Sequence, residues 1–293
     1  MPPHTGHQYL IRFARAFSRD LTVFVCTLSH EPIPGELRFR WMSELFPDVR
    51  LVHVTEEIPQ AARSSEGAQA IWADAIRSRM EHDPAYVFAS EEYGLGFAAA
   101  LGARFVPVDP RREIFPISAG MIREHPFRHW SFIPDVVRPY FAKKVVVLDA
   151  RGTLIPELAG RYETIHATDY PAYARSLALA APGIAAAADL AAAQAASEAA
   201  LMLQANRVLF TPTDPLFTLV QAGLPADDRR EAIARLGNGH PNLAPDLIVA
   251  AQPVPRAYRE AIAEIGWRLE ERQGVDAARD AIVAYLDEIL TDQ

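Results

Sequence analysis

Two histidines lie three residues apart near the start of the chain, in the stretch Pro2-Pro3-His4-Thr5-Gly6-His7. An amphipathic helical pattern follows, so this spacing puts both imidazoles on one face of a helix start. The free N–H groups and the positive end of the helix dipole point the same way and favour an anion, above all phosphate. Gly6 lets the backbone approach a ligand closely. The alternative is that His4 and His7 are ordinary capping and core residues.

A second candidate element is Ile117-Ser118-Ala119-Gly120-Met121-Ile122-Arg123. Its hydroxyl precedes a predicted helical turn, and its arginine follows five residues later. Ser118 and backbone N–H groups can donate to phosphate oxygens, and the Arg123 fork can clamp them bidentately. The element therefore suits a triphosphate. The alternative is a capped helix with a surface arginine.

The length of 293 residues favours about two domains, and 50% hydrophobic residues are enough for a sizeable core. A net charge of −8 argues against a dedicated nucleic-acid binder but leaves room for a local basic pocket. The single cysteine, Cys26, suits a reducing cytosol. No signal peptide or membrane span is evident, because the Ala-rich tract 178–200 is interrupted and reads as helix. We therefore expect a cytoplasmic protein with no membrane partner.

The first half alternates between predicted strands and helices. Apolar runs predict strands over 21–26, 49–54, 86–89 and 104–108, and helical spacing fills the intervals apart from a polar loop at 59–67. Such alternation is typical of a parallel α/β sheet, whose ligands bind beyond the carboxyl ends of the strands. His30, Ser90, Glu91 and Asp109 lie at such ends.

The second half reads as another α/β unit. A buried strand is predicted from Lys144, followed by a long Ala-rich helix to Asn206, a strand at 207–210 and a helix at 215–223. A weaker strand at 247–250 precedes two terminal helices. We place the boundary after residue 142, which gives domains at 1–142 and 143–293.

The His-x-Gly-His stretch resembles the first signature of the nucleotidyltransferase superfamily, and residues 117–123 match its second, I-S-x-x-x-I-R. Several further stretches of residues 2–148 resemble the NadR-type family, which joins a nicotinamide mononucleotide adenylyltransferase to a ribosylnicotinamide kinase. The resemblance implies an α/β protein with a Rossmann-like nucleotidyltransferase sheet followed by a P-loop-kinase-like domain. The stretches that carry it are Glu31–Arg38 with Trp41, Phe46–Arg50, Ser90–Gly94, Pro107–Asp109, Pro126–Trp130, Ile133-Pro134 and Val137–Phe141.

The resemblance implies that nicotinamide mononucleotide and ATP, with Mg²⁺, give NAD and pyrophosphate. His4 and His7 would hold the triphosphate and the α-phosphate, while Ser118 and Arg123 would hold the leaving pyrophosphate. No protein nucleophile is needed, since catalysis would come from positioning and charge stabilisation. Mg²⁺ would bridge phosphate oxygens with few direct protein ligands, so we predict no metal-binding residues.

Further residues are expected on the side of the mononucleotide. Trp41 and Trp72 are candidates for stacking on the cationic nicotinamide ring, although either is equally plausible as a core anchor. Arg38 is a candidate for the mononucleotide phosphate, with a solvated helix arginine as the alternative. Ser90 and Glu91 complete the predicted substrate site.

The chain departs from the family pattern in its first residues. In the family, a first strand precedes the histidines, whereas here residue 2 is already the proline. A missing central strand should leave unpaired backbone and a groove in the core. Either the start is misassigned, or the chain is truncated and impaired. A catalytically impaired nucleotide sensor or scaffold, or a nucleotidyltransferase with another acceptor, therefore stays open as an alternative function.

The kinase-like half also departs. Asp149 stands at the first glycine of the P-loop pattern, and Leu154-Ile155-Pro156 replace its Gly-Lys-Ser/Thr. We expect a degenerate kinase domain without activity, in which Asp214 caps a helix rather than binding Mg²⁺. The oligomeric state is not fixed, and a homo-oligomer stays open.

Overall fold

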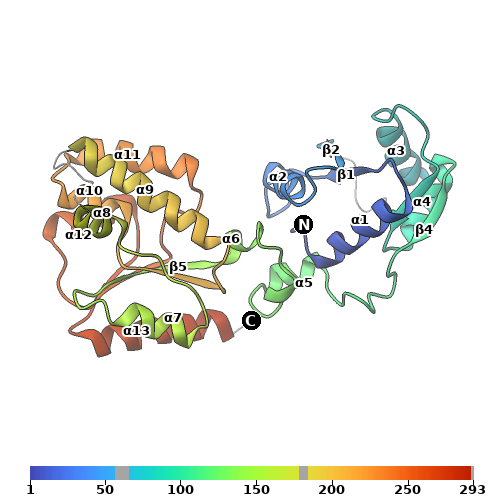
Figure 1. Ribbon diagram of the computed structural model, residues 1–293. Coiled ribbons are helices and arrows are strands. Elements are labelled where there is room, and N and C mark those ends of the chain that lie inside the picture. Colours follow the sequence, from blue (N-terminus) through green and yellow to red (C-terminus); the bar gives the residue numbers. More distant parts are fainter. Residues whose placement is uncertain (57–65, 178–183, 292–293) are drawn as a thin grey trace. The chain divides into compact units, whose positions relative to one another are not determined.

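The computed structural model describes residues 1–56, 66–177 and 184–291 (Figure 1), so most of the predicted loop at 59–67 and part of the Ala-rich tract lie outside the described residues. The chain divides into two compact units, Met1–Val137 and Arg138–Gln293. The boundary after Val137 therefore lies before the boundary after residue 142 that we predicted from the sequence. The short helix α6 (Arg138–Phe141) belongs to the second unit, where the carbonyl of Pro139 accepts a hydrogen bond from Asn242 Nδ2 at 2.8 Å.

The first unit alternates helices and strands along the chain. Its elements are α1 (Thr5–Phe17), β1 (Thr22–Cys26), α2 (Gly35–Leu45), β2 (Arg50–Val54), α3 (Glu66–Arg77), β3 (Tyr86–Ala89), α4 (Tyr93–Leu101), β4 (Arg104–Pro107), α5 (Ala119–Glu124) and the 3₁₀ turn η2 (Trp130–Phe132).

The strands of the first unit form two separate parallel pairs. Thr22 of β1 aligns with Arg50 of β2, and Tyr86 of β3 aligns with Arg104 of β4. The apolar side chains of β1 alternate between two small clusters, one with α1 and α2 and the other with α3 and α4. The sequence pattern predicted a buried strand at 21–26, but every residue of β1 is half-buried. The reason is that β1 has a strand neighbour on one edge alone among the described residues.

The second unit is built around one four-stranded parallel sheet. Its remaining elements are β5 (Lys143–Leu148), α7 (Leu154–Arg161), α8 (Tyr170–Ser176), α9 (Ile184–Met202), β6 (Val208–Thr211), α10 (Pro215–Gln221), α11 (Ala226–Gly239), β7 (Leu247–Ala250), α12 (Arg256–Ile265), β8 (Leu269–Glu271) and α13 (Val275–Thr291).

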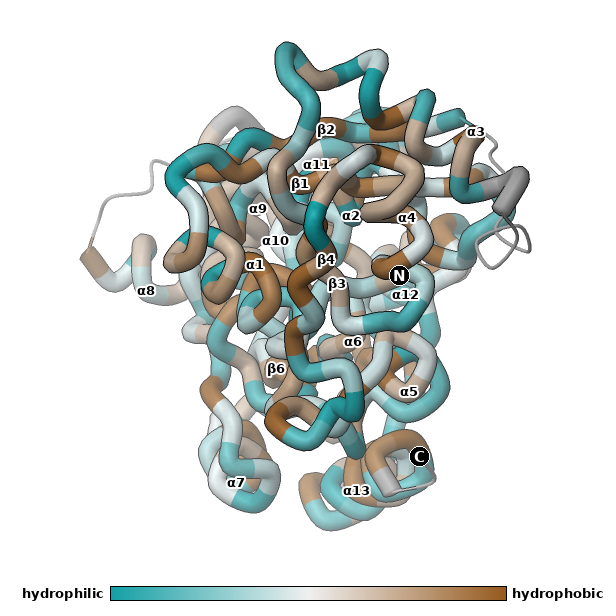
Figure 2. The backbone as a smooth tube through the Cα atoms, turned by 90° about the vertical axis from the view of Figure 1, so that its right-hand side faces the viewer, coloured by the Kyte–Doolittle hydropathy of each residue, from teal (hydrophilic) through white to brown (hydrophobic). Residues whose placement is uncertain are grey.

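The sheet order is β6-β5-β7-β8, with β5 and β7 at the centre. Helices α7 and α13 cover one face and α10 and α12 the other, so β6, β7 and all but the first residue of β5 are buried (Figure 1). Hydrophobic and hydrophilic residues alternate along α13, as expected for a helix with one buried face (Figure 2). The predicted α/β fold class is confirmed. Among the described helices, none has the length and apolarity to cross a membrane.

Candidate functional site

The first turn of α1 is held together by its two histidines. His4 is the N-cap residue, and its Nδ1 accepts a hydrogen bond from the N–H of Gly6 at 3.1 Å. His7 reaches back, and its Nδ1 accepts the N–H of His4 at 3.3 Å. The ring centroids are 3.9 Å apart. The capping alternative raised from the sequence is therefore correct, and it coexists with the ability to meet a ligand.

These hydrogen bonds decide which ring nitrogens carry protons. Because Nδ1 of His4 and of His7 both accept backbone N–H groups, the neutral imidazoles carry their protons on Nε2. Each Nε2–H group is then a side-chain donor at the start of α1. Two side-chain donors and the positive end of the helix together favour an anion.

Both imidazoles are neutral near pH 7. Burial, followed by the charges of His7 and Arg112, lowers the pKa of His4 from 6.5 to about 2. Burial, followed by the charges of the Met1 amine and Arg112, lowers the pKa of His7 to about 4. An arriving anion would offset these neighbouring positive charges, so the site is suited to a phosphate and unsuited to a cation.

Gly6 is required by the close approach of His4. A Cβ atom at this position would lie 2.9 Å from Cε1 and 3.0 Å from Nδ1 of the His4 ring. Real Cβ contacts are not so short, so a side chain here would push the imidazole out of its capping position. Gly6 therefore keeps the His4 ring seated against the helix.

Arg112 joins the site from the loop after β4, and sequence reasoning missed it. Its charge lowers the pKa of both histidines, and its guanidinium donates to Glu91 at 2.9 Å. Asp109 shapes this loop, because its carboxylate accepts the N–H groups of residues 113, 114 and 115 at 2.8–3.2 Å. Burial opposes ionisation of Asp109, but these hydrogen bonds hold its pKa below the usual range. The sequence offered one signal for Arg112, which is a basic residue shortly after the end of a predicted strand.

Ser118 and Arg123 lie on one short helix. Ser118 is the N-cap of α5, and its Oγ accepts the N–H of Met121 at 3.2 Å. Arg123 in the last turn has a buried Nη1 atom with no hydrogen-bond partner among the described residues. A guanidinium N–H group is a strong donor to phosphate oxygens, so Arg123 stays a candidate for the anion. Its charge also acts on the Met1 amine, which in turn acts on His7.

Arg38 is buried, so the alternative of a solvated helix arginine is wrong. Its side chain on α2 is 3% exposed and forms an ion pair with Glu31. Glu31 also accepts the N–H of Leu28 at 2.9 Å. Burial opposes ionisation of Glu31, but these two donors lower its pKa. Burial, followed by the charge of Arg38, lowers the pKa of the Met1 amine to about 5, while Glu31 opposes this shift and Arg123 adds to it.

The other predicted substrate residues are spread more widely. Trp41 and Trp72 are 4% and 7% exposed, and Trp72 packs with Val54 in the apolar cluster beneath β1 and β2. Ser90 follows β3 and is half-buried, while the neighbouring Glu91 is held by Arg112. The roles of these residues toward the mononucleotide stay predictions.

The charged groups gathered at α1 include no set that could hold a metal ion. Across the described ranges, no cluster of three or more His, Cys, Asp or Glu side chains suits a metal. The cations and imidazole N–H groups at the site match phosphate oxygens instead. This set of groups fits a Mg²⁺ ion that is held by the phosphates of a nucleotide.

In the second unit, the backbone N–H groups of the loop after β5 donate to a carboxylate of the same loop, that of Asp149. Asp149 accepts the N–H groups of Arg151, Thr153 and Leu154 at 2.9–3.2 Å, directly before α7. Burial opposes ionisation, but these bonds lower the pKa of Asp149. Asp214 caps α10 by accepting the N–H of Phe217 at 2.9 Å, as the sequence predicted.

No protein-family profile matches the chain. Among curated proteins it is similar to the trifunctional NAD biosynthesis/regulator proteins NadR of Salmonella typhimurium (strain LT2) and Escherichia coli (strain K12). The identities are 28% and 29% over 190 residues, which cover 58% of this chain and 46% of each relative. The chain thus spans about half the length of these relatives.

Solved structures give the matching fold. A crystal structure of a NadR protein in complex with NAD and AMP-PNP has a TM-score of 0.76 at 21% identity, covering 99% of this chain and 93% of that one. The chain is therefore similar to NadR proteins in sequence and in fold. A second NadR structure, in complex with NR, has a TM-score of 0.75 at 20% identity with the same coverages. The NadR-type assignment made from the sequence motifs is confirmed.

Proposed function

We propose that the first unit of this NadR-type chain transfers AMP from ATP to nicotinamide mononucleotide, giving NAD and pyrophosphate. The observation that carries the proposal is the pair of Nε2–H donors of His4 and His7 at the start of α1, on which the positive charge of Arg112 acts. The relatives named for NAD biosynthesis, and the NadR structure that holds NAD and AMP-PNP, support this choice of nucleotides.

The reaction needs positioning and charge compensation rather than a protein nucleophile. A 5′-phosphate oxygen of the mononucleotide bonds to the α-phosphorus of ATP, the bond to the α,β-bridging oxygen breaks, and pyrophosphate leaves with that electron pair. His4 and His7 donate Nε2–H groups to the phosphates at the reacting centre, and Arg123 binds the leaving pyrophosphate. Mg²⁺ arrives with ATP and neutralises its phosphate charge.

The test is incubation of the full chain with ATP, nicotinamide mononucleotide and Mg²⁺. NAD, measured with an NAD-dependent dehydrogenase, should form in equal amount to pyrophosphate. Replacing the mononucleotide by its nicotinic acid analogue measures the acceptor preference. Binding of ATP in a calorimeter without any NAD or pyrophosphate would contradict the proposal.

A second candidate is a nucleotide sensor that binds without turnover. The separation of the first unit into two strand pairs favours it, because a divided sheet positions the site less rigidly than a continuous one. This candidate predicts that ATP or NAD binds while the reaction above stays silent. The same calorimetric and product measurements therefore distinguish the two functions.

We further propose that the second unit does not phosphorylate nicotinamide riboside. The N–H groups leading into α7, which could receive a phosphate, are occupied by the Asp149 carboxylate, and its negative charge repels phosphate. The chain incubated with ATP and the riboside should give no mononucleotide. Mononucleotide formation by the Arg123→Ala variant, in which the first unit is disabled, would contradict this proposal.

A further inference from the structure

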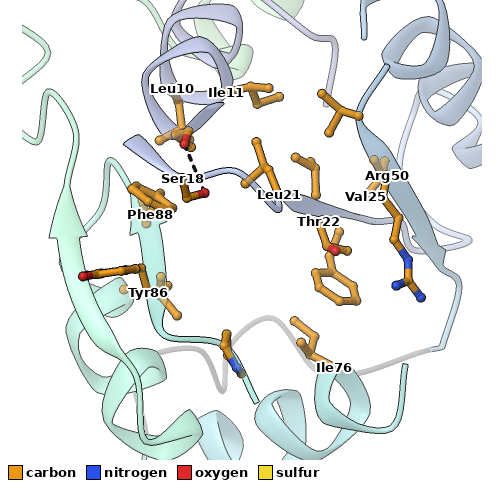
Figure 3. A pocket seen from close by; sticks show the side chains of 18 of the residues that line it. Leu10, Ile11, Ser18, Leu21, Thr22, Val25, Arg50, Ile76, Tyr86 and Phe88 are labelled. Carbon is orange, nitrogen blue, oxygen red and sulfur yellow. Dashed lines mark hydrogen bonds between the residues drawn. The ribbon is translucent and has the colours of Figure 1, made fainter. Parts of the chain in front are cut away.

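A cavity of about 1520 Å³ lies inside the first unit, lined in part by side chains of β1 and β3 such as Val25 and Tyr86 (Figure 3). Its lining also includes His7 from the first turn of α1, Glu31 from the loop before α2, and Arg38 on α2. An imidazole of the candidate phosphate site and a pair of opposite charges therefore border one common space.

Arg38 is a charged residue on the buried face of α2. It is buried together with Trp41 and Met42, which follow one turn later on the same helix. An apolar side chain would pack at this position at lower cost, because a guanidinium that leaves water loses its hydration. A buried charge of this kind is weak evidence for stability, and in a cavity it indicates a functional residue.

Glu31 supplies the opposite charge that permits this burial. Its carboxylate oxygen Oε2 pairs with Nη2 of Arg38, and the Glu31 side chain is itself 8% exposed. The same oxygen accepts the N–H of Leu28 at 2.9 Å, and the carbonyl of Leu28 accepts the N–H of Glu31 at 3.3 Å. The carboxylate is thus anchored in a tight turn and holds one end of the guanidinium.

The guanidinium of Arg38 has further donors. A guanidinium carries its N–H groups in a planar fork, and the pair with Glu31 is made through Nη2 at one end of that fork. Nε of Arg38 is buried and has no hydrogen-bond partner among the described residues. An unpaired buried donor is unfavourable, so an anionic oxygen bound there would satisfy it through a charge-assisted hydrogen bond. Phosphate oxygens fit such a fork.

We propose that Glu31 is a positioning residue for the acceptor of the adenylyl group. It holds Arg38 by the Nη2 end of the guanidinium and so directs the rest of the fork to the 5′-phosphate of the mononucleotide. The inference rests on the proposed function and deepens it, since Glu31 acts on the acceptor through Arg38 and itself touches neither substrate.

The start of α2 is fixed to the strands by contacts that do not involve Glu31. A Cβ atom at Gly35 would lie 2.6 Å from Thr27 Oγ1, so this glycine permits α2 to begin directly against the end of β1. Thr27 Oγ1 is in turn 2.8 Å from Nε2 of His53 on β2. A change at Glu31 should therefore displace the Arg38 fork and leave the helix in place.

Two other roles for Glu31 predict different behaviour. As a counter-charge alone, it would compete with anions at Arg38, so its neutralisation would strengthen their binding. As a structural residue alone, it would affect both substrates alike when replaced. Glutamine and aspartate separate these roles. Glutamine carries no charge, but its carbonyl oxygen can accept both N–H groups that Oε2 accepts, whereas aspartate keeps the charge and is one methylene shorter.

The test measures the binding of nicotinamide mononucleotide, and separately of ATP with Mg²⁺, to the full chain by isothermal calorimetry. Glu31→Asp should weaken mononucleotide binding by about 10-fold, because the fork is displaced. Glu31→Gln should bind the mononucleotide within about threefold of the unsubstituted chain. Neither variant should change ATP binding. Arg40→Lys, at an exposed position on α2, is the matched control and should change neither affinity.

Circular dichroism shows whether each variant is folded. Unchanged mononucleotide binding in Glu31→Asp would overturn the inference, and so would an equal loss of mononucleotide and ATP binding in either variant. If Glu31→Asp does not fold, Glu31→Gln decides, because a change of more than about 10-fold in its mononucleotide affinity would overturn the inference. Absence of mononucleotide binding by the unsubstituted chain would overturn it together with the proposed function. Since binding is measured without turnover, a chain that meets these expectations and forms no NAD would overturn the proposed function alone.

Discussion

His7 accepts a hydrogen bond from the backbone of His4 through Nδ1 at 3.3 Å, and the two rings lie 3.9 Å apart. The same contact that caps α1 therefore fixes the Nε2 proton of His7 as a donor. Capping and the proposed phosphate binding would use opposite nitrogens of one ring. Substitutions can separate the two roles, because asparagine imitates the Nδ1 side of histidine and glutamine the Nε2 side.

His7→Asn should fold normally and lose activity. Its side-chain oxygen can accept the N–H of His4, but no group replaces the Nε2 donor, so NAD formation should fall by about 10²–10³-fold. Circular dichroism and steady-state rates of NAD formation check this. His166→Asn, at an exposed histidine of the second unit, is the matched control and should keep the full rate. A fully active His7→Asn protein would remove His7 from the phosphate site.

Acid should destabilise the first unit before the pH reaches the ordinary carboxyl range. The pKa values of His4 and His7 in the folded chain, about 2 and about 4, are below the unfolded value of 6.5. The unfolded chain binds more protons below pH 6.5, so this stability is fully present above pH 6.5 and is lost as the pH falls toward 4. Urea unfolding at several pH values, followed by hydrogen exchange of the first-unit amides, measures this. The free energy of unfolding should depend less steeply on pH in His7→Asn than in the unsubstituted chain.

Gly6→Ala should displace the His4 ring. The new Cβ would lie 2.9 Å from Cε1, so capping is lost and both thermal stability and the rate of NAD formation should fall. Gly120→Ala on α5 is the matched control, because its Cβ would lie 3.6 Å from Ser118 Oγ, an ordinary contact. Differential scanning calorimetry should show the control unchanged or stabilised by up to about 1 kcal/mol. Equal melting temperatures for the two variants would contradict the close approach at Gly6.

Arg112→Ala should weaken ATP binding, whereas Arg111→Ala should not. Arg112 acts on both imidazoles, while the Arg111 side chain is 84% exposed and its nearest acidic partner is Glu113. The pKa of His4 and His7 should also rise in Arg112→Ala, because a positive neighbour is lost. Isothermal calorimetry and NMR titration of the imidazole signals measure both effects. Identical behaviour of the two variants would place Arg112 outside the site.

Asp214→Asn should stabilise the second unit at high pH. Burial raises the pKa of Asp214 to about 6, and its carboxylate also accepts the hydroxyl of Tyr258. The folded chain binds the extra proton between pH 4 and 6, so stability falls as the pH rises through that window. The variant should gain on the order of 1–3 kcal/mol at pH 8 and little at pH 4. Urea unfolding at pH 4 and at pH 8, followed by hydrogen exchange of the second-unit amides, checks this.

Much of the fold was predictable because buried parallel strands leave continuous apolar runs. The runs at 49–54 and 207–210 correspond to β2 (Arg50–Val54) and β6 (Val208–Thr211). β8 was missed because its residues, Leu269–Glu271, include two glutamates and lie at the sheet edge. Helices α8 and α11 were also missed. α11 contains no buried residue, so its apolar pattern is weak.

The candidate site was predictable where one short motif supplies the chemistry. His4, Gly6 and His7 form a local unit, and local geometry follows from local sequence. Arg112 could not be found in this way, since the loop that presents it depends on the three N–H groups bound by Asp109. The burial of Arg38 likewise depends on its ion pair with Glu31 in the loop before α2, which helical spacing alone does not predict.

The neutral state of the two imidazoles has a thermodynamic signature of its own. Their pKa values are low because they are buried and face positive charge, and a bound triphosphate would reverse that electrostatic balance. Nucleotide binding should then draw protons from the solution. The enthalpy measured by calorimetry at pH 6 should consequently vary with the ionisation enthalpy of the buffer, and the number of protons taken up should fall toward zero at pH 8.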